Sequence, residues 1–223
     1  MREGEDLTTE LEELIKIFLK PVQGIPFHIA IQTLTGKMVY KLNKSDDKDK
    51  KLIEKLSKAA DIAVKNANHI GIYRNRPNEV GNDMEPYVKD ALKEIGLQPE
   101  TPKRSDGVRQ STGYPDIYFK DDFNRHIYLE CKTYNKGNIS TTLRAFYLSP
   151  PISGKSKIIY DALHIVLSFE IEQITRDNRR CYIPVAWKLV DIYNMKLDVK
   201  HEFNAHNIEM YGHDAIITEG KID

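Results

Sequence analysis

The residues best suited to chemistry lie in the segment YPDIYFKDDFNRHIYLECKTY, residues 114–134. Two apolar runs flank a polar turn, which predicts a β-hairpin, yet its strands also carry Asp116, Glu130 and Lys132. Side chains alternate between the two faces of a strand, so Glu130 and Lys132 share a face, roughly 6–7 Å apart. If the strands pair, Asp116 comes close to Glu130. Two neighbouring carboxylates repel each other unless a cation lies between them, and a site with only oxygen ligands favours Mg²⁺ over zinc.

The lysine completes a set of groups suited to cutting phosphodiester bonds. An ammonium beside a metal-bound pair of carboxylates can position a water or hydroxide and offset the charge of a phosphorane-like transition state. The structural alternative is an exposed cross-strand ion pair, because Glu-x-Lys occurs by chance on many strands. Both parts of the motif fall on the strands of one hairpin, which favours the chemical interpretation.

Several helices and strands must position this hairpin. Hydrophobic periodicity predicts three helices, and Pro86 in the third favours a regular start near Asn82, with Ser45 as the N-cap of the second. The helices are expected over residues 9–20, 45–68 and 79–95. Further strands are expected in a hairpin over 27–42 that turns at Thr35-Gly36, and over 163–173 and 180–193, with a loop over 97–113. This order indicates an α/β fold, in which a mixed β-sheet has helices packed against it.

Composition limits the classes of protein to which the chain can belong. Its 223 residues are 40% hydrophobic and 30% charged, which fits a globular protein with a substantial core. The 33 basic residues balance the 33 acidic ones, which argues against a protein that coats DNA non-specifically. No apolar run approaches a membrane span. The start of the chain lacks a signal peptide, so we expect a cytoplasmic protein. The two cysteines, Cys131 and Cys181, lie in apolar runs and are expected to be buried free thiols.

The string YPDIYF…IYLECKTY resembles the PD-(D/E)XK nuclease superfamily, with Asp116, Glu130 and Lys132 in the motif positions. Members often carry a further acid on a helix before the hairpin. Here NEVGNDMEPYVKDAL offers Glu85, which falls in a Gly-Asn-x-x-Glu pattern, and Glu79 as the second choice. The structural alternative for both is a solvated glutamate favoured by the helix dipole.

Within that superfamily the chain looks most like a type II restriction endonuclease. The resemblance implies a restriction-endonuclease-like fold, one nuclease domain over 1–223, with an N-terminal helical and hairpin part of about 1–70 and a catalytic core of about 78–193. It implies a Mg²⁺-dependent homodimer that cuts both strands of DNA to 5′-phosphate and 3′-hydroxyl ends. It also implies metal ligation by Asp116, Glu130 and the backbone carbonyl of Cys131, and a water-activating role for Lys132. A cognate DNA methyltransferase is expected in the same system, though not as a bound partner.

Sequence-specific cutting also needs side chains that read base edges and anchor phosphates. The loop PKRSDGVRQSTG and its neighbours supply candidates, although each is individually an ordinary solvated residue by type. The candidate DNA-binding residues are Lys103, Arg104, Arg109, Gln110, Arg74, Arg76, Asn138, Ser140, Thr141 and Arg144.

Three other functions remain open. A repair or recombination nuclease that recognises DNA structure would use the same chemistry on junctions, mismatches or nicks. A nucleic-acid-binding module could keep the fold without catalysis, although all three motif side chains are intact. The third is a structural α/β domain in which the motif is coincidental.

Overall fold

The computed structural model describes residues 2–76, 79–135, 137, 146–151, 154–200, 206, 216 and 218. It divides into two compact units, one formed by Met1–Ile25 with Lys196–Asp223 and the other by Pro26–Met195. The first contains helix α1 (Arg2–Phe18), and the short strands β1 (Ile25–Pro26) and β7 (Lys196–Leu197) pair with each other. Within the described residues, no helix has both the length and the apolar character that a membrane span requires.

A five-stranded mixed sheet is the centre of the second unit. Its middle strand is β5 (Ala162–Arg176), which pairs in parallel with β4 (His126–Tyr134). Strand β3 (Ile117–Lys120) lies antiparallel beyond β4. On the other edge of β5, β2 (Val39–Tyr40) pairs in parallel with its first residues and β6 (Arg179–Asp191) runs antiparallel along the rest.

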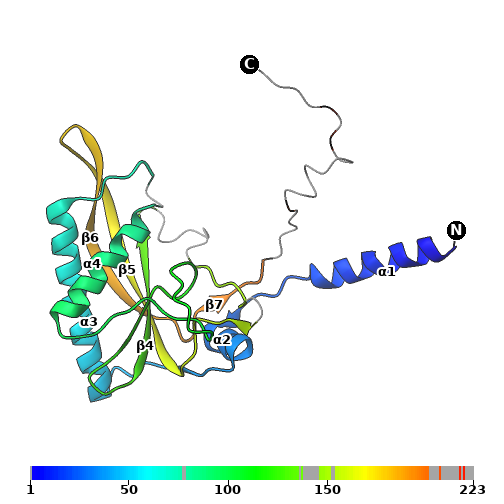
Figure 1. Cartoon of the computed structure of the whole chain (residues 1–223), viewed down its shortest axis with the longest axis horizontal. Coiled ribbons are helices and arrows are strands. Elements are labelled where there is room, and N and C mark those ends of the chain that lie inside the picture. The colour runs from blue at the N-terminus through cyan, green and yellow to red at the C-terminus, as the bar shows by residue number, and fades with distance from the viewer. Residues whose placement is uncertain are drawn as a thin grey trace. The chain divides into compact units, whose positions relative to one another are not determined.

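Helices α3 (Asp47–Ile70) and α4 (Val80–Glu94) pack against each other, α3 lying against β6 and α4 against β4 (Figure 1). Both helices turn an apolar stripe inward, and alternate residues of β4 and β5 meet them. The core thus joins Leu56 and Ala63 of α3, Val88 of α4, and Leu129 and Leu167 of the sheet, all almost fully buried. This arrangement confirms the expected α/β class and the mixed sheet flanked by helices.

The predicted hairpin over 27–42 is wrong. Residues Phe27–Thr35 form helix α2, which ends at Gly36 with a positive φ of 70°, and only β2 follows. Phe27 and Ile31 are the buried residues of α2 and lie one helical turn apart. The run contains so many other apolar residues that this helical spacing was not evident from the sequence. Two smaller differences concern helix starts: Asp46, not Ser45, is the N-cap of α3, and α4 begins at Val80 despite Pro86.

The sheet face away from α3 and α4 is also buried, around His164 of β5. Its ring is fully buried and contacts Phe27 and Tyr128, and its Nδ1 and the Tyr114 hydroxyl form a hydrogen bond of 2.6 Å. Its Nε2 has no hydrogen-bond partner among the described residues. Burial lowers the pKa of His164 to about 3. The imidazole is therefore held neutral beside Tyr128, on the sheet face that Glu130 shares.

We expect His164 to make stability depend on pH. Its pKa of about 3 in the folded protein lies below the pKa of about 6.5 that a histidine has in an unfolded chain. Between these values the unfolded chain binds one more proton, so the free energy of unfolding falls as the pH drops, by up to about 1.4 kcal/mol per pH unit. His164→Gln, which keeps a polar partner for Tyr114, should lose this part of the slope in denaturant titrations between about pH 4 and pH 7.

The matched control is His69→Gln, at the exposed end of α3, which should keep the wild-type slope. If the free energy of unfolding depended equally on pH in wild type and in His164→Gln, that result would contradict the claim that His164 is buried in its neutral form.

Candidate active site

The hairpin of β3 and β4 brings the two acids of the motif together. Its register pairs Ile117 with Leu129 and Tyr118 with Tyr128, and extending it by one residue places Asp116 opposite Glu130. The backbone N–H of Cys131 donates to Asp116 Oδ2 at 2.8 Å, which fixes the carboxylate at the end of the pairing. The observed β3 and β4 confirm the hairpin expected over 114–134.

Burial and mutual repulsion dominate the electrostatics of these acids. Glu130 is 3% exposed, and burial together with the nearby charge of Asp116 raises its pKa to about 7. Burial also raises the pKa of Asp116, against the hydrogen bond from Cys131 and the charge of Lys132. Lys132 Nζ lies 2.6 Å from Glu130 Oε1. Two acids and an ammonium therefore meet at one place, as the alternation along β4 predicted.

The oxygen atoms at this place fit a divalent cation. Glu130 Oε2 is buried and has no hydrogen-bond partner among the described residues, although a buried carboxylate oxygen ordinarily has one. A cation held by Asp116, Glu130, the Cys131 carbonyl and water would match the oxygen ligands that Mg²⁺ takes. No three His, Cys, Asp or Glu side chains within the described residues lie together as a ready metal cluster. The Cys131 thiol is unsuited as a ligand, because burial raises its pKa well above its usual range.

Of the two candidate helix acids, Glu85 lies near the hairpin. The charge of Glu85 raises the pKa of Asp116, so the two carboxylates interact. Glu85 Oε1 is 2.6 Å from Lys89 Nζ, which also donates to Thr101 Oγ1 at 2.8 Å. Glu79 is exposed at the start of α4, and its charge acts on Arg74.

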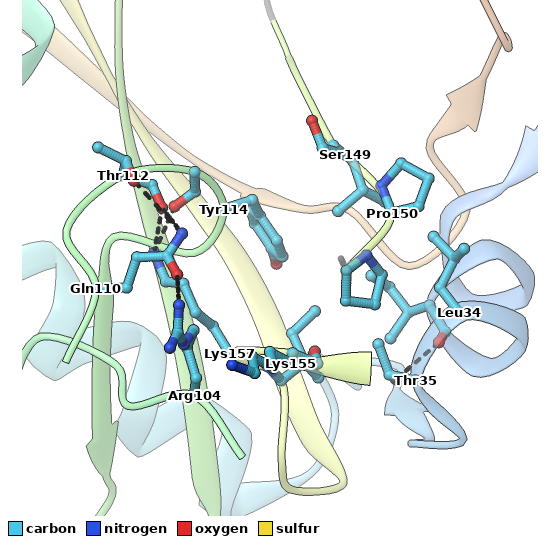
Figure 2. Close-up of a pocket in the computed structure, with 16 residues that line it drawn as sticks. Leu34, Thr35, Arg104, Gln110, Thr112, Tyr114, Ser149, Pro150, Lys155 and Lys157 are labelled. Atoms are coloured by element: carbon cyan, nitrogen blue, oxygen red, sulfur yellow. Dashed lines mark hydrogen bonds between the residues drawn. The ribbon is translucent and has the colours of Figure 1, made fainter. Parts of the chain in front are cut away.

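The loop that contains the best group of DNA-binding candidates borders a pocket of about 430 Å³ (Figure 2). Arg104 donates to both carboxylate oxygens of Asp106, at 3.1 and 2.5 Å, and to Gln110 Oε1 at 3.4 Å. The Arg104 guanidinium lowers the pKa of Asp106 to about 2. Lys103 is 3.9 Å from Glu100, whereas Arg109 is exposed. Lys103 and Arg109 are therefore freer than Arg104 to meet a phosphate.

The other candidates are dispersed. Arg74 donates through Nε and Nη2 to the two carboxylate oxygens of Asp83, at 2.7 and 2.6 Å, so it braces α4. Arg76 is exposed on the same loop. The remaining four candidates, Asn138, Ser140, Thr141 and Arg144, lie outside the described residues.

Sequence reasoning missed two lysines beside the acids. Lys89 holds Glu85 one turn along α4, and the Glu-x-x-x-Lys spacing was a signal for this pair. Lys157 is buried, and burial lowers its pKa, an effect that the charges of Asp116, Glu130 and Glu85 only partly offset. Lys157 precedes β5 in a polar segment, where nothing in the local pattern distinguishes a buried lysine from a solvated one.

We expect Glu130→Gln to stabilise the fold at alkaline pH. The Glu130 pKa of about 7 exceeds the value of about 4.3 for an unfolded chain, so the folded state holds a proton that the unfolded chain has lost. Stability therefore falls as the pH rises through this window, and the neutral amide should restore on the order of 2 kcal/mol at about pH 8. Thermal melts in metal-free buffer measure it, with the exposed Glu94→Gln as control. A lower melting temperature for Glu130→Gln than for wild type at that pH would contradict the buried charge.

Comparison with known proteins identifies the family. The model of the type II restriction enzyme MjaV family matches residues 21–214. The type II restriction enzyme MjaV of Methanocaldococcus jannaschii is 38% identical, in an alignment covering 94% of this chain and 95% of that protein. No solved structure matches the chain. The resemblance to restriction endonucleases is thereby confirmed: the chain belongs to the MjaV family of type II restriction enzymes, which are site-specific deoxyribonucleases.

Proposed function

We propose that this restriction enzyme uses Mg²⁺ to hydrolyse both strands of duplex DNA, leaving 5′-phosphate and 3′-hydroxyl ends. The observation that carries the proposal is the meeting of partly buried Asp116 with buried Glu130. Glu130 Oε1 contacts the Lys132 ammonium, while its Oε2 has no hydrogen-bond partner among the described residues. We assign the cleavage to a catalytic core of about residues 78–193 within one nuclease domain. We further propose that the enzyme acts in the cytoplasm as a homodimer, with a cognate methyltransferase in the same system.

Each residue of the site has a part in this chemistry. Asp116, Glu130 and the Cys131 carbonyl would hold the cation, and the Cys131 N–H keeps Asp116 in place. When bound, Mg²⁺ supplies positive charge that stabilises the negative charge developing on the scissile phosphate. Lys132 orients the attacking water through its ammonium and offsets the charge of the transition state. Glu85, tied to Lys89, adds a third negative charge close to Asp116 and completes the acidic side of the site.

Bound DNA would extend from this site over the neighbouring loops. We propose phosphate or base contacts from Lys103, Arg104, Arg109 and Gln110, with Arg74 and Arg76 nearby in sequence, and from Asn138, Ser140, Thr141 and Arg144. The ion pairs of Arg104 and Arg74 with Asp106 and Asp83 support a role for these two arginines in shaping the loops. Exposed Arg109 and half-exposed Lys103 are the better phosphate contacts.

We expect the protein with Mg²⁺ to cut a long unmethylated phage DNA into discrete fragments. EDTA should abolish cutting. Asp116→Asn and Lys132→Met should each slow it at least about a hundredfold, because each removes a group that holds or offsets charge at the phosphate. Asp122→Asn, an exposed carboxylate in the turn of the same hairpin, is the matched control and should cut at the wild-type rate. Fragments that a DNA ligase joins without prior phosphorylation would establish the 5′-phosphate and 3′-hydroxyl ends.

A smear of products would instead favour the structure-directed or non-specific nuclease. DNA that stays intact with Mg²⁺ and with Mn²⁺ would contradict catalysis and favour a binding module.

We expect the loop over 103–110 to contribute phosphate contacts that respond to salt. The double variant Lys103→Ala, Arg109→Ala should make the negative slope of log K against log salt concentration shallower by about 1.8, because each lost phosphate contact removes about 0.9. Fluorescence anisotropy with a labelled duplex in metal-free buffer measures it. Lys50→Ala with Lys93→Ala, two exposed helix lysines, should keep the wild-type slope. An unchanged slope in the loop variant would remove this loop from the DNA interface.

A further inference from the structure

Lys157 is a lysine buried beside the acids of the site. It is 6% exposed and lies in the segment 154–161 that leads into β5. Its Nζ donates to the carbonyl of Gly113 at 2.5 Å and approaches the carbonyl of Thr112 at 3.4 Å. Gly113 and Thr112 stand three and four positions before Asp116 in the chain. The ammonium thus holds the loop from which Asp116 emerges.

The segment around Lys157 is itself fixed from two sides. The Ile159 N–H donates to the Tyr128 hydroxyl at 2.9 Å, which ties the segment to β4. The Ser105 N–H donates to the Ser156 carbonyl at 2.9 Å, which ties it to the loop before the hairpin. Figure 2 shows Lys157 in the wall of the pocket, with Arg104, Gln110 and Thr112 nearby. The tie to Tyr128 of β4 is therefore independent of the loop that Lys157 holds, whereas the tie through Ser105 joins the segment to an earlier part of that loop.

Charge also links Lys157 to the acids. Burial lowers the pKa of Lys157, while the charges of Asp116, Glu130 and Glu85 raise it. In return the Lys157 charge lowers the pKa of Asp116. A neutral hydrogen-bond donor would be enough to anchor the loop. Burying an ammonium costs more free energy than burying a neutral group, unless opposite charges face it. A lysine at position 157 therefore suits the nearby carboxylate of Asp116, which must stay ionised in the proposed function.

We propose that Lys157 is a positioning residue of the cleavage site: it clamps the carbonyls of Thr112 and Gly113 and faces the three acids with a fixed positive charge, so that Asp116 stays placed for catalysis. This role rests on the proposed function, in which Asp116 holds the cation. Lys157 acts through Asp116 and its loop, unlike Lys132, which adjoins Glu130 directly.

The test compares Lys157→Met with Lys157→Arg, which keeps the charge and the donors. Single-turnover cleavage with Mg²⁺ should slow 10- to 100-fold in the Met variant, as is usual for groups that orient a metal ligand, and should largely recover in the Arg variant. The affinity for a labelled duplex in metal-free buffer should stay at the wild-type value in both. Lys120→Met, at the exposed end of β3, is the matched control and should cleave normally.

Two results, one from cleavage and one from DNA binding, would overturn the proposal. Wild-type rates in Lys157→Met would show that the clamp is dispensable. Weaker DNA binding with a salt slope reduced by about 1 would make Lys157 a phosphate contact instead. If Lys157→Met melts at a much lower temperature, Lys157→Gln replaces it as the neutral variant.

Hydrogen exchange of the protein alone separates this proposal from the proposed function. In the neutral variant the amides of residues 110–116 should exchange faster than in wild type, and in Lys157→Arg they should not. Unchanged exchange in the neutral variant would overturn the clamp even in an enzyme that cleaves. If wild type fails to cleave any DNA, the proposed function falls, while faster exchange over 110–116 would still support the clamp.

Discussion

The pairing register of β3 with β4 is the constraint on which the site depends. Because side chains alternate along a strand, a slip of one residue would move Glu130 and Lys132 to the other face and away from Asp116. The turn of the hairpin fixes the register. Asp121 Oδ1 accepts the N–H groups of Phe123 and Arg125, both at 2.9 Å. Arg125 then bridges Asp121 and Asp49 of α3, at 2.7 and 2.6 Å, so the hairpin is aligned on the helix layer as well.

Burial of the acidic site lowers the stability of the fold, and lysines beside the acids offset part of that loss. Burial raises the pKa of both Asp116 and Glu130, so each carboxylate is less stable there than in water. Lys132 faces Glu130, Lys89 faces Glu85 and Lys157 counters Asp116. Strand β4 contributes its other face, with Ile127 and Leu129, to the apolar core against α3 and α4. One strand thus carries the chemistry on one side and part of the stability on the other.

The sequence predicted the geometry of the β3–β4 hairpin better than the elements around it. Alternation alone placed Glu130 and Lys132 on one face, because a strand has a single two-residue period and β4 follows it. Helix α2 was mistaken for a strand, because FHIAIQTLT is short and apolar, and its buried pair is only Phe27 and Ile31. Lys157 was missed for a different reason. Its contact with Gly113 spans 44 residues and exists only because the chain returns to place β5 beside β4, which no local pattern encodes.

The most direct test of the account is the position of a bound cation. Crystals of the protein soaked with Mn²⁺, with diffraction recorded above the manganese absorption edge, would locate the ion by its anomalous signal. We expect a peak between the Asp116 and Glu130 carboxylates, close enough to both for direct bonds of about 2.1 Å, and next to the Cys131 carbonyl. A peak elsewhere in the protein, or none at saturating Mn²⁺, would contradict the claim that these two acids hold the catalytic metal.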